Sequence, residues 1–230
     1  MKKAGLSPRL LAAADFVRRG AVLADVGTDH AYLPLFLLSE GLIERAVCSD
    51  VNRGPLDTAE ANAKALGFFD KIDFVLADGA SVLADRGISD MAICGMGGEL
   101  IADIILKAPF IKTDKVRLIL QPMSKQAHLR RFLAKEGFYI REEKYSSEEH
   151  RNYVCILAEY DGKERELTPL EAEIGRAPYT KSDSALLGYI KDRISSLEKA
   201  VNGKRLCGTA SLEEETLTAL QNVLKNLSLE

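Results

Sequence analysis

The chain has 230 residues, of which 47% are apolar and 28% are charged. This length allows one full domain with a smaller appendage, and the apolar content excludes a disordered chain. The net charge is only −3, from 31 basic and 34 acidic residues. A nucleic-acid-binding function would therefore have to depend on a local basic patch.

The chain contains four cysteines, Cys48, Cys94, Cys155 and Cys207. No two of them are spaced as a C-x-x-C pair, so we expect free thiols in a reducing compartment and no metal site. The N-terminal Met-Lys-Lys resembles the start of a signal peptide. The stretch after it is interrupted by Pro8, Arg9 and Asp15 and is too short to span a bilayer. We therefore predict a cytoplasmic protein without a membrane partner.

A helix is predicted near the N-terminus. Ser7 and Pro8 are a typical pair for a helix cap and first turn. Apolar residues then recur at helical spacing, at Leu10, Leu11, Ala14 and Val17. Gly20 is expected to end the helix. Its polar face carries Arg9, Arg18 and Arg19, which form either a phosphate-binding patch or an ordinary solvated face.

A strand, a glycine turn and a helix start follow, as in the first unit of a nucleotide-binding fold. The apolar run 22–26 ends abruptly at Gly27, and the polar residues 28–30 precede a helical pattern from Ala31. Glycine lets a ligand approach the backbone closely because it has no side chain. The helix start supplies unpaired N–H groups that can bind a carboxylate or a phosphate.

The acids around this turn indicate which ligand it suits. A dinucleotide site needs G-x-G-x-x-G, whereas Gly27 stands alone here. Asp25 and Asp29 would repel phosphate and attract a cation. S-adenosylmethionine (SAM) carries a sulfonium and an ammonium group and no phosphate. The stretch therefore favours SAM, with a strand and turn of some other α/β protein as the alternative.

Strands and helices alternate after this unit, which predicts a parallel sheet covered by helices on both faces. The further strands are 46–50, 72–77, 91–94 and 116–120, and the helices are 31–40, 54–66, 99–107 and 125–135. Gly67 is expected to end the second of these helices. Two final strands, 138–145 and 152–160, are expected to form an antiparallel hairpin with an acidic loop.

Ligands bind such sheets at the carboxyl ends of the strands. Asp50 follows the second strand, where an acid can accept hydrogen bonds from ribose hydroxyls, and Asp78 follows the third, where an acid can accept one from an adenine amino group. The glycine-rich run 95–98 would let a ligand approach the fourth strand. The candidate cofactor-binding residues are Asp25, Gly27, Asp50, Val51, Asn52, Asp78, Gly79, Gly95, Met96 and Gly97.

The pattern changes after Tyr160, so we predict a SAM-binding domain over 1–160 and a helical domain over 161–230. Thr168 and Pro169 begin a short helix. Two seams at heptad-like spacing follow, Leu187, Ile190, Ile194, Leu197 and Val201, then Leu217, Leu220, Leu224 and Leu227. They predict a coiled-coil hairpin with a loop at 202–210, which packs on the sheet domain or on another copy.

Three runs of the sequence resemble one known family. They are Ala24-Asp-Val-Gly-Thr-Asp-His-Ala-Tyr-Leu-Pro34, Cys94-Gly-Met-Gly-Gly98 with Leu100 and Ile101, and Leu118-Ile-Leu-Gln-Pro122 with Leu129, Arg130 and Leu133. Together they look like the bacterial tRNA adenine-22 N1-methyltransferases. The chain departs from the family at Met123, where a polar residue, usually Asn, is expected after Gln-Pro.

This resemblance implies a SAM-dependent enzyme that methylates N1 of the adenine at position 22 in tRNA. It also implies the class I methyltransferase fold, a Rossmann-like sheet of seven mostly parallel strands with the last strand antiparallel. The family also has a C-terminal coiled-coil domain that the predicted helical hairpin resembles. Whether the protein is a monomer or a weak dimer is left open by the sequence.

The candidate catalytic residues are Asp29, His30 and Tyr32. Adenine N1 has a free lone pair, so the enzyme needs positioning and electrostatics more than a strong base. Asp29 could stabilise the cationic product or accept a proton from the amine, or it could serve only to bind the SAM ammonium group. His30 could instead cap the helix, and Tyr32 could stack on the adenine or pack on the first strand.

Because N1 lies on the Watson–Crick edge, the base must be unpaired or flipped out before it reacts. Recognition of tRNA should then depend on its shape and phosphates. The candidate tRNA-binding residues are Arg9, Arg18, Arg19, Gln121, Pro122, Lys125, Arg130 and Arg131. The near-neutral chain predicts weak binding at high salt.

Three rival functions remain open from sequence. A methyltransferase acting on another RNA, a protein or a small molecule would share the sheet motifs. A noncatalytic SAM- or RNA-binding module is disfavoured because acids are present at the strand ends. A nicotinamide-dependent oxidoreductase is disfavoured because the additional glycines of the dinucleotide motif are missing.

Overall fold

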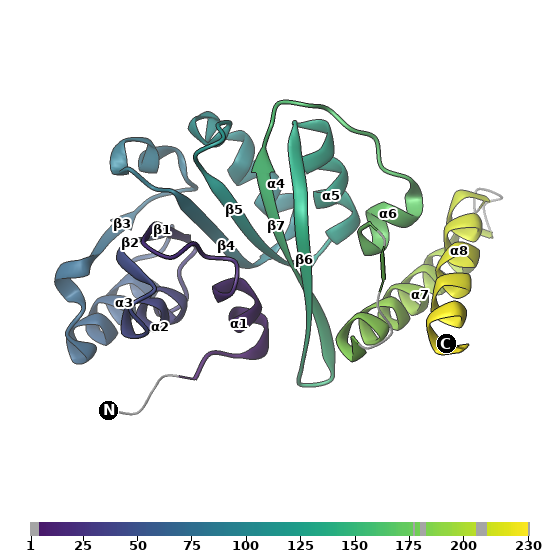
Figure 1. Cartoon of the computed structure of the whole chain (residues 1–230), viewed down its shortest axis with the longest axis horizontal. Helices are drawn as coiled ribbons and strands as arrows, with labels where there is room; N and C mark the ends of the chain where they lie inside the picture. Colours follow the sequence, from purple (N-terminus) through teal and green to yellow (C-terminus); the bar gives the residue numbers. More distant parts are fainter. Residues whose placement is uncertain (1–4, 177, 180–182, 206–210, 230) are drawn as a thin grey trace.

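The computed structural model of the protein describes residues 5–176, 178–179, 183–205 and 211–229, and its centre is a seven-stranded sheet in the order β3-β2-β1-β4-β5-β7-β6 (Figure 1). The strands are β1 (Ala21–Val26), β2 (Ile43–Asp50), β3 (Ile72–Leu76), β4 (Asp90–Gly97), β5 (Arg117–Ser124), β6 (Phe138–Glu148) and β7 (Arg151–Tyr160). β1 to β5 pair in parallel, while β7 is antiparallel to both β5 and β6. This confirms the predicted alternation and terminal hairpin.

Eight α-helices accompany the sheet in the described part of the chain. They are α1 (Pro8–Ala14), α2 (Tyr32–Ser39), α3 (Arg53–Leu66), α4 (Gly98–Leu106), α5 (Gln126–Lys135), α6 (Pro169–Ile174), α7 (Ser184–Arg205) and α8 (Ser211–Leu229). Three short 3-10 helices lie between strands, η1 (Phe69–Lys71), η2 (Ser81–Arg86) and η3 (Pro109–Ile111). α3 ends at Gly67, whose φ of 75° is readily adopted by glycine, as predicted.

The sheet is buried on both faces, which explains the nearly continuous apolar runs of its strands. Leu23 belongs to a buried cluster with residues of α1, α2 and α3, and its neighbour Ala24 belongs to a second cluster with residues of α4 and α5. Successive side chains of a strand point to opposite faces, so the two helical layers cover opposite sides of the sheet.

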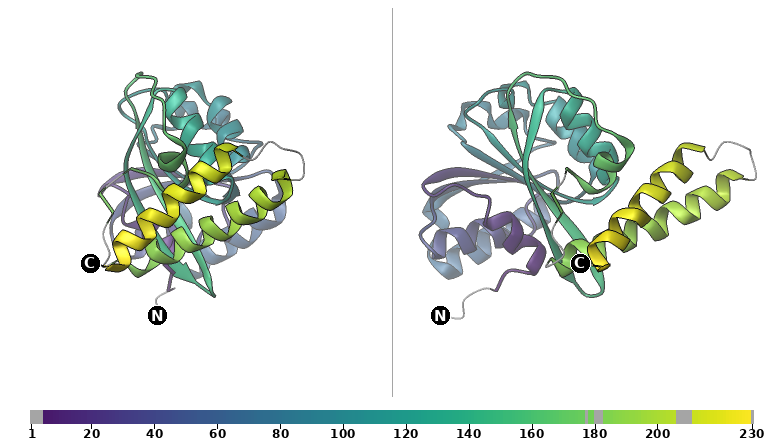
Figure 2. Two further views of the ribbon diagram at one scale, coloured as in Figure 1. Left: turned by 90° about the vertical axis from the view of Figure 1, so that its right-hand side faces the viewer. Right: turned by 45° about the vertical axis from the view of Figure 1, so that its right-hand side comes forward.

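The C-terminal helices extend the second of these clusters. Ile190 and Leu197 of α7 and Leu220 of α8 are buried, and the cluster joins them to sheet residues such as Ile156 of β7. α7 and α8 run side by side beyond β6 (Figure 2). The C-terminal helical hairpin therefore packs on the sheet and its helices, which was one of the two predicted partners.

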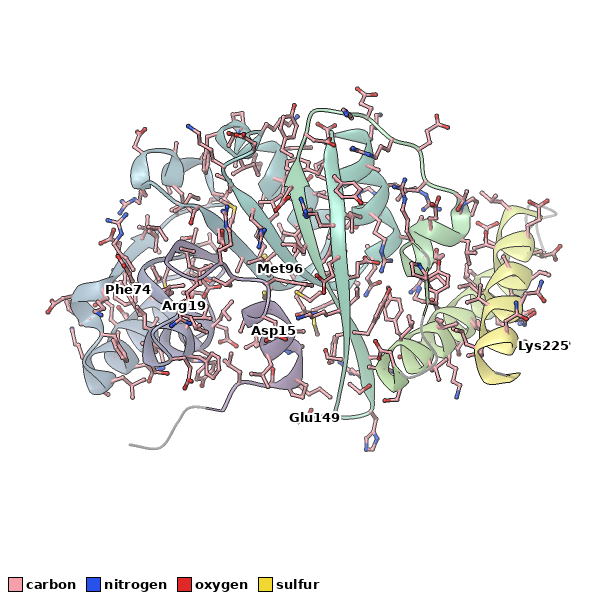
Figure 3. All side chains as sticks on the ribbon, in the orientation of Figure 1. Asp15, Arg19, Phe74, Met96, Glu149 and Lys225 are labelled. Carbon is pink, nitrogen blue, oxygen red and sulfur yellow. The ribbon has the colours of Figure 1, made fainter. Side chains whose placement is uncertain are left out.

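The β6–β7 hairpin has a shorter connection than the sequence suggested. Ser147 pairs with Asn152, and the turn itself consists of Glu149 and His150, at the tip marked by Glu149 in Figure 3. Both turn residues have positive φ angles, 47° and 66°. This combination is the one that a tight two-residue turn between twisted strands requires.

The prediction that the N-terminal helix continues to Gly20 is wrong, because α1 ends at Ala14. The side chain of Arg18 donates from Nε to Asp90 Oδ1 at 2.7 Å, and the Arg18 backbone N–H donates to Asp90 Oδ2 at 2.7 Å. Asp90 is fully buried at the start of β4, so its charge needs these partners. The helix therefore ends before Arg18, because this long-range ion pair holds Arg18 at Asp90.

Two of the parallel strands continue past their predicted ends. β4 runs on through Met96 to Gly97, and β5 includes Gln121 and Pro122 and ends at Ser124. Proline has no N–H to donate to a neighbouring strand. Pro122 pairs with Met96 of β4, and the register of the two strands shifts on either side of this pair. The irregular pairing accommodates the proline, so the Gln-Pro pair does not end the strand.

The loop predicted at 202–210 is partly helical. α7 continues to Arg205, and residues 206–210, including Cys207, lie outside the described part of the chain. The other three cysteines, Cys48, Cys94 and Cys155, are free thiols as predicted.

Replacing Gly98 by alanine is expected to lower the free energy of unfolding by about 1–3 kcal/mol, as overpacking does. A Cβ at Gly98, the first residue of α4, would lie 2.5 Å from the backbone oxygen of Lys125. Gly54 in the first turn of α3 is the matched control, because a Cβ there meets nothing within 4 Å. Urea unfolding should show Gly98→Ala destabilised and Gly54→Ala neutral or stabilised; equal midpoints would refute the close approach.

Candidate functional site

A cleft of about 310 Å³ opens where the carboxyl ends of β1, β2 and β4 meet. Its wall combines carboxylates, glycines and apolar side chains from elements far apart in the sequence. It is lined by Arg9, Leu10, Asp25, Gly27, Asp29, Tyr32, Leu33, Asp50, Cys94, Gly95, Met96 and Met123. This is the location that ligands of open parallel sheets occupy.

The turn between β1 and α2 is held in an unusual backbone conformation. Gly27, His30 and Ala31 all have positive φ angles, of 71°, 59° and 57°. The N–H groups of Gly27 and Thr28 both donate to the carbonyl of Ser49 on β2, at 2.8 and 2.9 Å. Left-handed conformations at non-glycine residues persist where the surroundings fix them, and such strain is common at functional sites.

Glycine at position 27 also makes room for a neighbouring side chain. A Cβ there would lie 1.8 Å from Cε of Met96, a residue of β4. A side chain at position 27 would displace the end of the Met96 side chain. Gly27 therefore serves the packing of Met96 on this turn.

Asp25 is a buried carboxyl at the floor of the cleft. Thr28 Oγ1 donates a hydrogen bond to it at 2.6 Å. Burial raises the pKa of Asp25 from 3.8 to about 6; the Thr28 hydrogen bond opposes this shift, and the charges of Asp29 and Asp50 add to it. A ligand cation would relieve the mutual repulsion of these three carboxylates.

The raised pKa of Asp25 makes a stability prediction with a defined sign. The folded state binds the proton more tightly than the unfolded state, so ionisation of Asp25 destabilises the fold as pH rises from about 4 to about 6. Asp25→Asn keeps the Thr28 hydrogen bond and removes this penalty. Urea unfolding should therefore show the free energy of unfolding of the variant rising relative to that of the wild type over this pH range, by at most about 3 kcal/mol. A difference that does not vary with pH would contradict the assignment.

The three candidate catalytic residues lie together at the start of α2. His30 Nε2 is 3.1 Å from Asp29 Oδ1, and the His30 and Tyr32 rings are 5.4 Å apart between centroids. The Asp29 side chain is 74% exposed and Tyr32 is 44% exposed, and both line the cleft. His30 does not line it, and its Nδ1 is buried without a hydrogen-bond partner in the described structure.

Gln121 connects the ends of β4 and β5 to the N-terminal helix. Its buried Oε1 accepts hydrogen bonds from the Gly95 backbone N–H at 3.1 Å and from Arg9 Nη1 at 3.3 Å. The sequence implied a tRNA contact for Gln121. The structure instead gives its carbonyl two protein partners, so the side chain fixes the Gly95 backbone and the Arg9 guanidinium.

The candidate cofactor-binding residues divide into two groups. Those that line the cleft are Asp25, Gly27, Asp50, Gly95 and Met96. Those that do not line it are Val51, Asn52, Asp78, Gly79 and Gly97, although the Asn52 N–H donates to Asp50 Oδ1 at 2.7 Å. Sequence reasoning missed the cleft wall made by Leu10, Leu33, Cys94 and Met123, because nothing local marks these residues as neighbours.

Two of the candidate tRNA-binding arginines make structural contacts within the protein. Arg18 pairs with Asp90 at the amino ends of the strands, at the opposite edge of the sheet from the cleft. Arg130 is fully buried and donates to Glu143 at 2.7 Å and to the carbonyls of Ala172 and Glu173 in α6. The prediction for Arg130 is wrong, because its guanidinium lies in the interior, where no phosphate can reach it. The side chain of Arg18 is 37% exposed, so a phosphate contact by Arg18 stays a prediction.

The other candidate tRNA-binding residues outside the cleft are exposed, except for Gln121 and Pro122. Arg19, Lys125 and Arg131 are exposed, and Lys125 lies 3.5 Å from Glu99. Pro122 is buried within β5. A larger cavity, of about 410 Å³, is lined by Arg130 and residues of β6 and α6, and it contains none of the strand ends that carry the candidate site.

A methyltransferase-domain family model matches residues 6–156 of this chain. A tRNA (adenine(22)-N(1))-methyltransferase of Bacillus subtilis is 34% identical to it over 169 residues, which cover 70% of this chain and 71% of that protein. The chain belongs to the tRNA (adenine(22)-N(1))-methyltransferase family. The resemblance noted in the sequence is thereby confirmed.

Solved structures of similar proteins have the same fold as this family member. A Streptococcus pneumoniae protein in complex with S-adenosyl-L-methionine is 32% identical, with 96% of this chain and 100% of that chain covered and a TM-score of 0.81. The Bacillus subtilis m1A22 tRNA methyltransferase is 26% identical, with 98% of each chain covered and a TM-score of 0.75. The protein thus has the Rossmann-like, seven-stranded methyltransferase fold that was predicted.

The cleft of this family member fits SAM by its own chemistry. Three carboxylates line it, and they suit a ligand with positive charges and ribose hydroxyls but no phosphate. The Gly95 backbone is open, since the nearest atom to a Cβ placed there is Arg9 Nη1 at 3.7 Å. In the described residues no three His, Cys, Asp or Glu side chains are grouped as a metal site requires. None of the described helices is long and apolar enough to cross a membrane.

Proposed function

We propose that this protein transfers the methyl group of SAM to N1 of the adenine at position 22 of tRNA, in the cytoplasm. The observation that carries this proposal is the similarity to the Bacillus subtilis tRNA (adenine(22)-N(1))-methyltransferase over more than two thirds of both chains. The acidic cleft at the strand ends supports it, because its charge suits the cofactor of such an enzyme.

The residues of the cleft have complementary roles toward this cofactor. When bound, SAM supplies a methyl group on a positively charged sulfur. Asp25 and Asp29 provide negative charge at the β1–α2 turn for the positive groups, and Asp50 at the end of β2 accepts hydrogen bonds from the ribose hydroxyls. Gly27 and Gly95 leave the backbone accessible on either side.

The acceptor needs little activation from the protein. Adenine N1 attacks with its lone pair, the new N–C bond forms as the C–S bond breaks, and the released electron pair stays on sulfur. The positive charge passes to the base, where the Asp29 carboxylate stabilises it or accepts a proton from the exocyclic amine. Tyr32 and Met123, both exposed in the cleft wall, offer apolar surfaces to the base.

Access of the base requires that it be unpaired or flipped out of the tRNA. The exposed side chains of Arg19, Lys125 and Arg131 are the basic groups proposed for phosphate contacts. Because they are separate and the chain is near neutral, tRNA binding should weaken strongly as salt is raised.

Titrations and a choice of acceptors test the proposal against its rivals. SAM should bind and NAD should not, and methyl label from SAM should enter tRNA in preference to ribosomal RNA or protein. NAD binding would favour an oxidoreductase. SAM binding without transfer to any acceptor would favour a noncatalytic module, and label in another RNA or a protein alone would overturn the tRNA assignment.

A further inference from the structure

Arg9 is a positive charge inside an acidic cleft. Among the described residues that line the cleft it alone is basic, whereas Asp25, Asp29 and Asp50 are acidic. The helix that carries it, α1, precedes the whole sheet, so nothing in the local pattern of residues places Arg9 beside the strand ends. Its position there needs a chemical explanation.

The guanidinium of Arg9 is fixed above the end of β4. Nη1 donates to Gln121 Oε1 at 3.3 Å, and the same oxygen accepts from the Gly95 N–H at 3.1 Å. A Cβ built on Gly95 would be 3.7 Å from Arg9 Nη1. Because Gln121 is buried and holds both groups, the guanidinium and the open Gly95 backbone face the same space.

Most of the donors of Arg9 remain available for a ligand. A guanidinium has five N–H donors. In the described structure the Nη1–Gln121 hydrogen bond engages one of them, while Glu148 Oε2 is 3.6 Å from Nε, an ion-pair distance but too long for a hydrogen bond. The Arg9 side chain is 25% exposed, so it is accessible from the cleft but largely shielded from bulk water.

Asp50 and the Gly95 backbone, which lies beside Arg9, belong to two strands on either side of β1. Asp50 ends β2, Gly95 lies in β4, and β1 runs between these strands. Neighbouring strands are about 4.8 Å apart, so the two positions are separated by roughly 10 Å. In SAM the sulfur joins the ribose to the amino-acid group, so a molecule with its ribose at Asp50 directs its amino-acid group toward Arg9.

We infer that Arg9 binds the carboxylate of the SAM amino-acid group, an inference that rests on the proposed cofactor. The planar guanidinium matches a carboxylate in shape and can donate two parallel hydrogen bonds to it. The acids of the β1–α2 turn then face the ammonium and sulfonium groups. The cleft thus complements both charges of the zwitterionic amino acid, and Arg9 is assigned to the cofactor rather than to a tRNA phosphate.

The surroundings of Arg9 favour this carboxylate over an RNA phosphate. A phosphate at Arg9 would approach the carboxylates that line the same cleft and would be repelled by them. The SAM carboxylate enters together with two positive groups of its own molecule, which offset that repulsion. Arg9 is also largely shielded, whereas the backbone of a folded RNA is bulky.

Decarboxylated SAM provides the direct test, since it keeps the sulfonium and ammonium groups and lacks the carboxylate. Calorimetric titration of the wild-type protein should show SAM binding about 10- to 100-fold more tightly than decarboxylated SAM. Arg9→Met should reduce this ratio to near one by weakening SAM, with decarboxylated SAM bound about as before. Arg9→Lys, which keeps the charge without the planar fork, should give an intermediate ratio.

Arg45→Met is the matched control for cofactor binding, because it removes the charge of an exposed arginine of β2 that does not line the cleft. Its SAM preference should equal that of the wild type. Binding of decarboxylated SAM to Arg9→Met reports that the variant is folded. An Arg9→Met protein that keeps the wild-type preference for SAM, while its KM for tRNA rises, would overturn the inference and make Arg9 a phosphate ligand.

These titrations contain no tRNA, so they are independent of the acceptor. A protein that shows the expected loss of preference in Arg9→Met but methylates no tRNA would support the role of Arg9 and overturn the proposed acceptor. A protein that methylates tRNA but keeps its preference for SAM in Arg9→Met would support the proposed acceptor and overturn the role of Arg9.

Discussion

Methyl transfer to tRNA at saturating SAM is expected to fall by about 100- to 1,000-fold when Asp29 is replaced by alanine. Asp29 lines the cleft, and its carboxylate is held 3.1 Å from His30 Nε2 on a turn of fixed backbone conformation. It is the most exposed of the three carboxylates that line the cleft, and we propose that it faces the incoming base. Removing it leaves the positive charge that develops on the adenine without a counter-charge. Single-turnover rates at high SAM concentration would measure the loss.

Asp29→Asn and the SAM affinity separate the two possible roles of this residue. Asparagine keeps the shape and the hydrogen-bond acceptor but lacks the charge, so a role in stabilising charge predicts a loss nearly as large as with alanine. A role restricted to SAM binding predicts that raising the SAM concentration restores the rate. Full activity of Asp29→Ala at ordinary SAM concentration would contradict both roles.

Asp50→Ala should weaken SAM binding by about 10- to 100-fold, the value of charge-assisted hydrogen bonds to the ribose. Asp50 lines the cleft at the end of β2, and the Asn52 N–H donates to its Oδ1 and orients the carboxylate. Asp70→Ala, in the exposed η1 segment, is the control and should bind SAM as the wild type does. Unchanged SAM affinity in Asp50→Ala would remove Asp50 from the cofactor site.

The order of the strands and helices could be predicted because it depends on local apolar periodicity. The end of α1 could not, since it is set by the pairing of Arg18 with Asp90, which is distant in sequence. The same holds for β5. The sequence at Pro122 predicts the end of a strand. The strand continues past Pro122 because its pairing with β4 is irregular there, which the local sequence does not indicate.

The candidate site could be predicted where its residues lie at or near the carboxyl ends of strands, as at Gly27, Asp50 and Gly95. It was not predictable where the fold brings distant residues together, as with Arg9. Arg130 illustrates the opposite failure. Arginine is usually exposed, so a surface role was expected, but carbonyls of α6 and the carboxylate of Glu143 satisfy its charge in the interior.

Transfer of labelled methyl groups from SAM to unmodified tRNA, followed by digestion and nucleoside analysis, tests the central claim most directly. The account predicts that N1-methyladenosine is formed, and that it is lost when the adenine at position 22 is replaced by another base. Formation of a different methylated nucleoside, or of N1-methyladenosine that persists after the replacement, would contradict it.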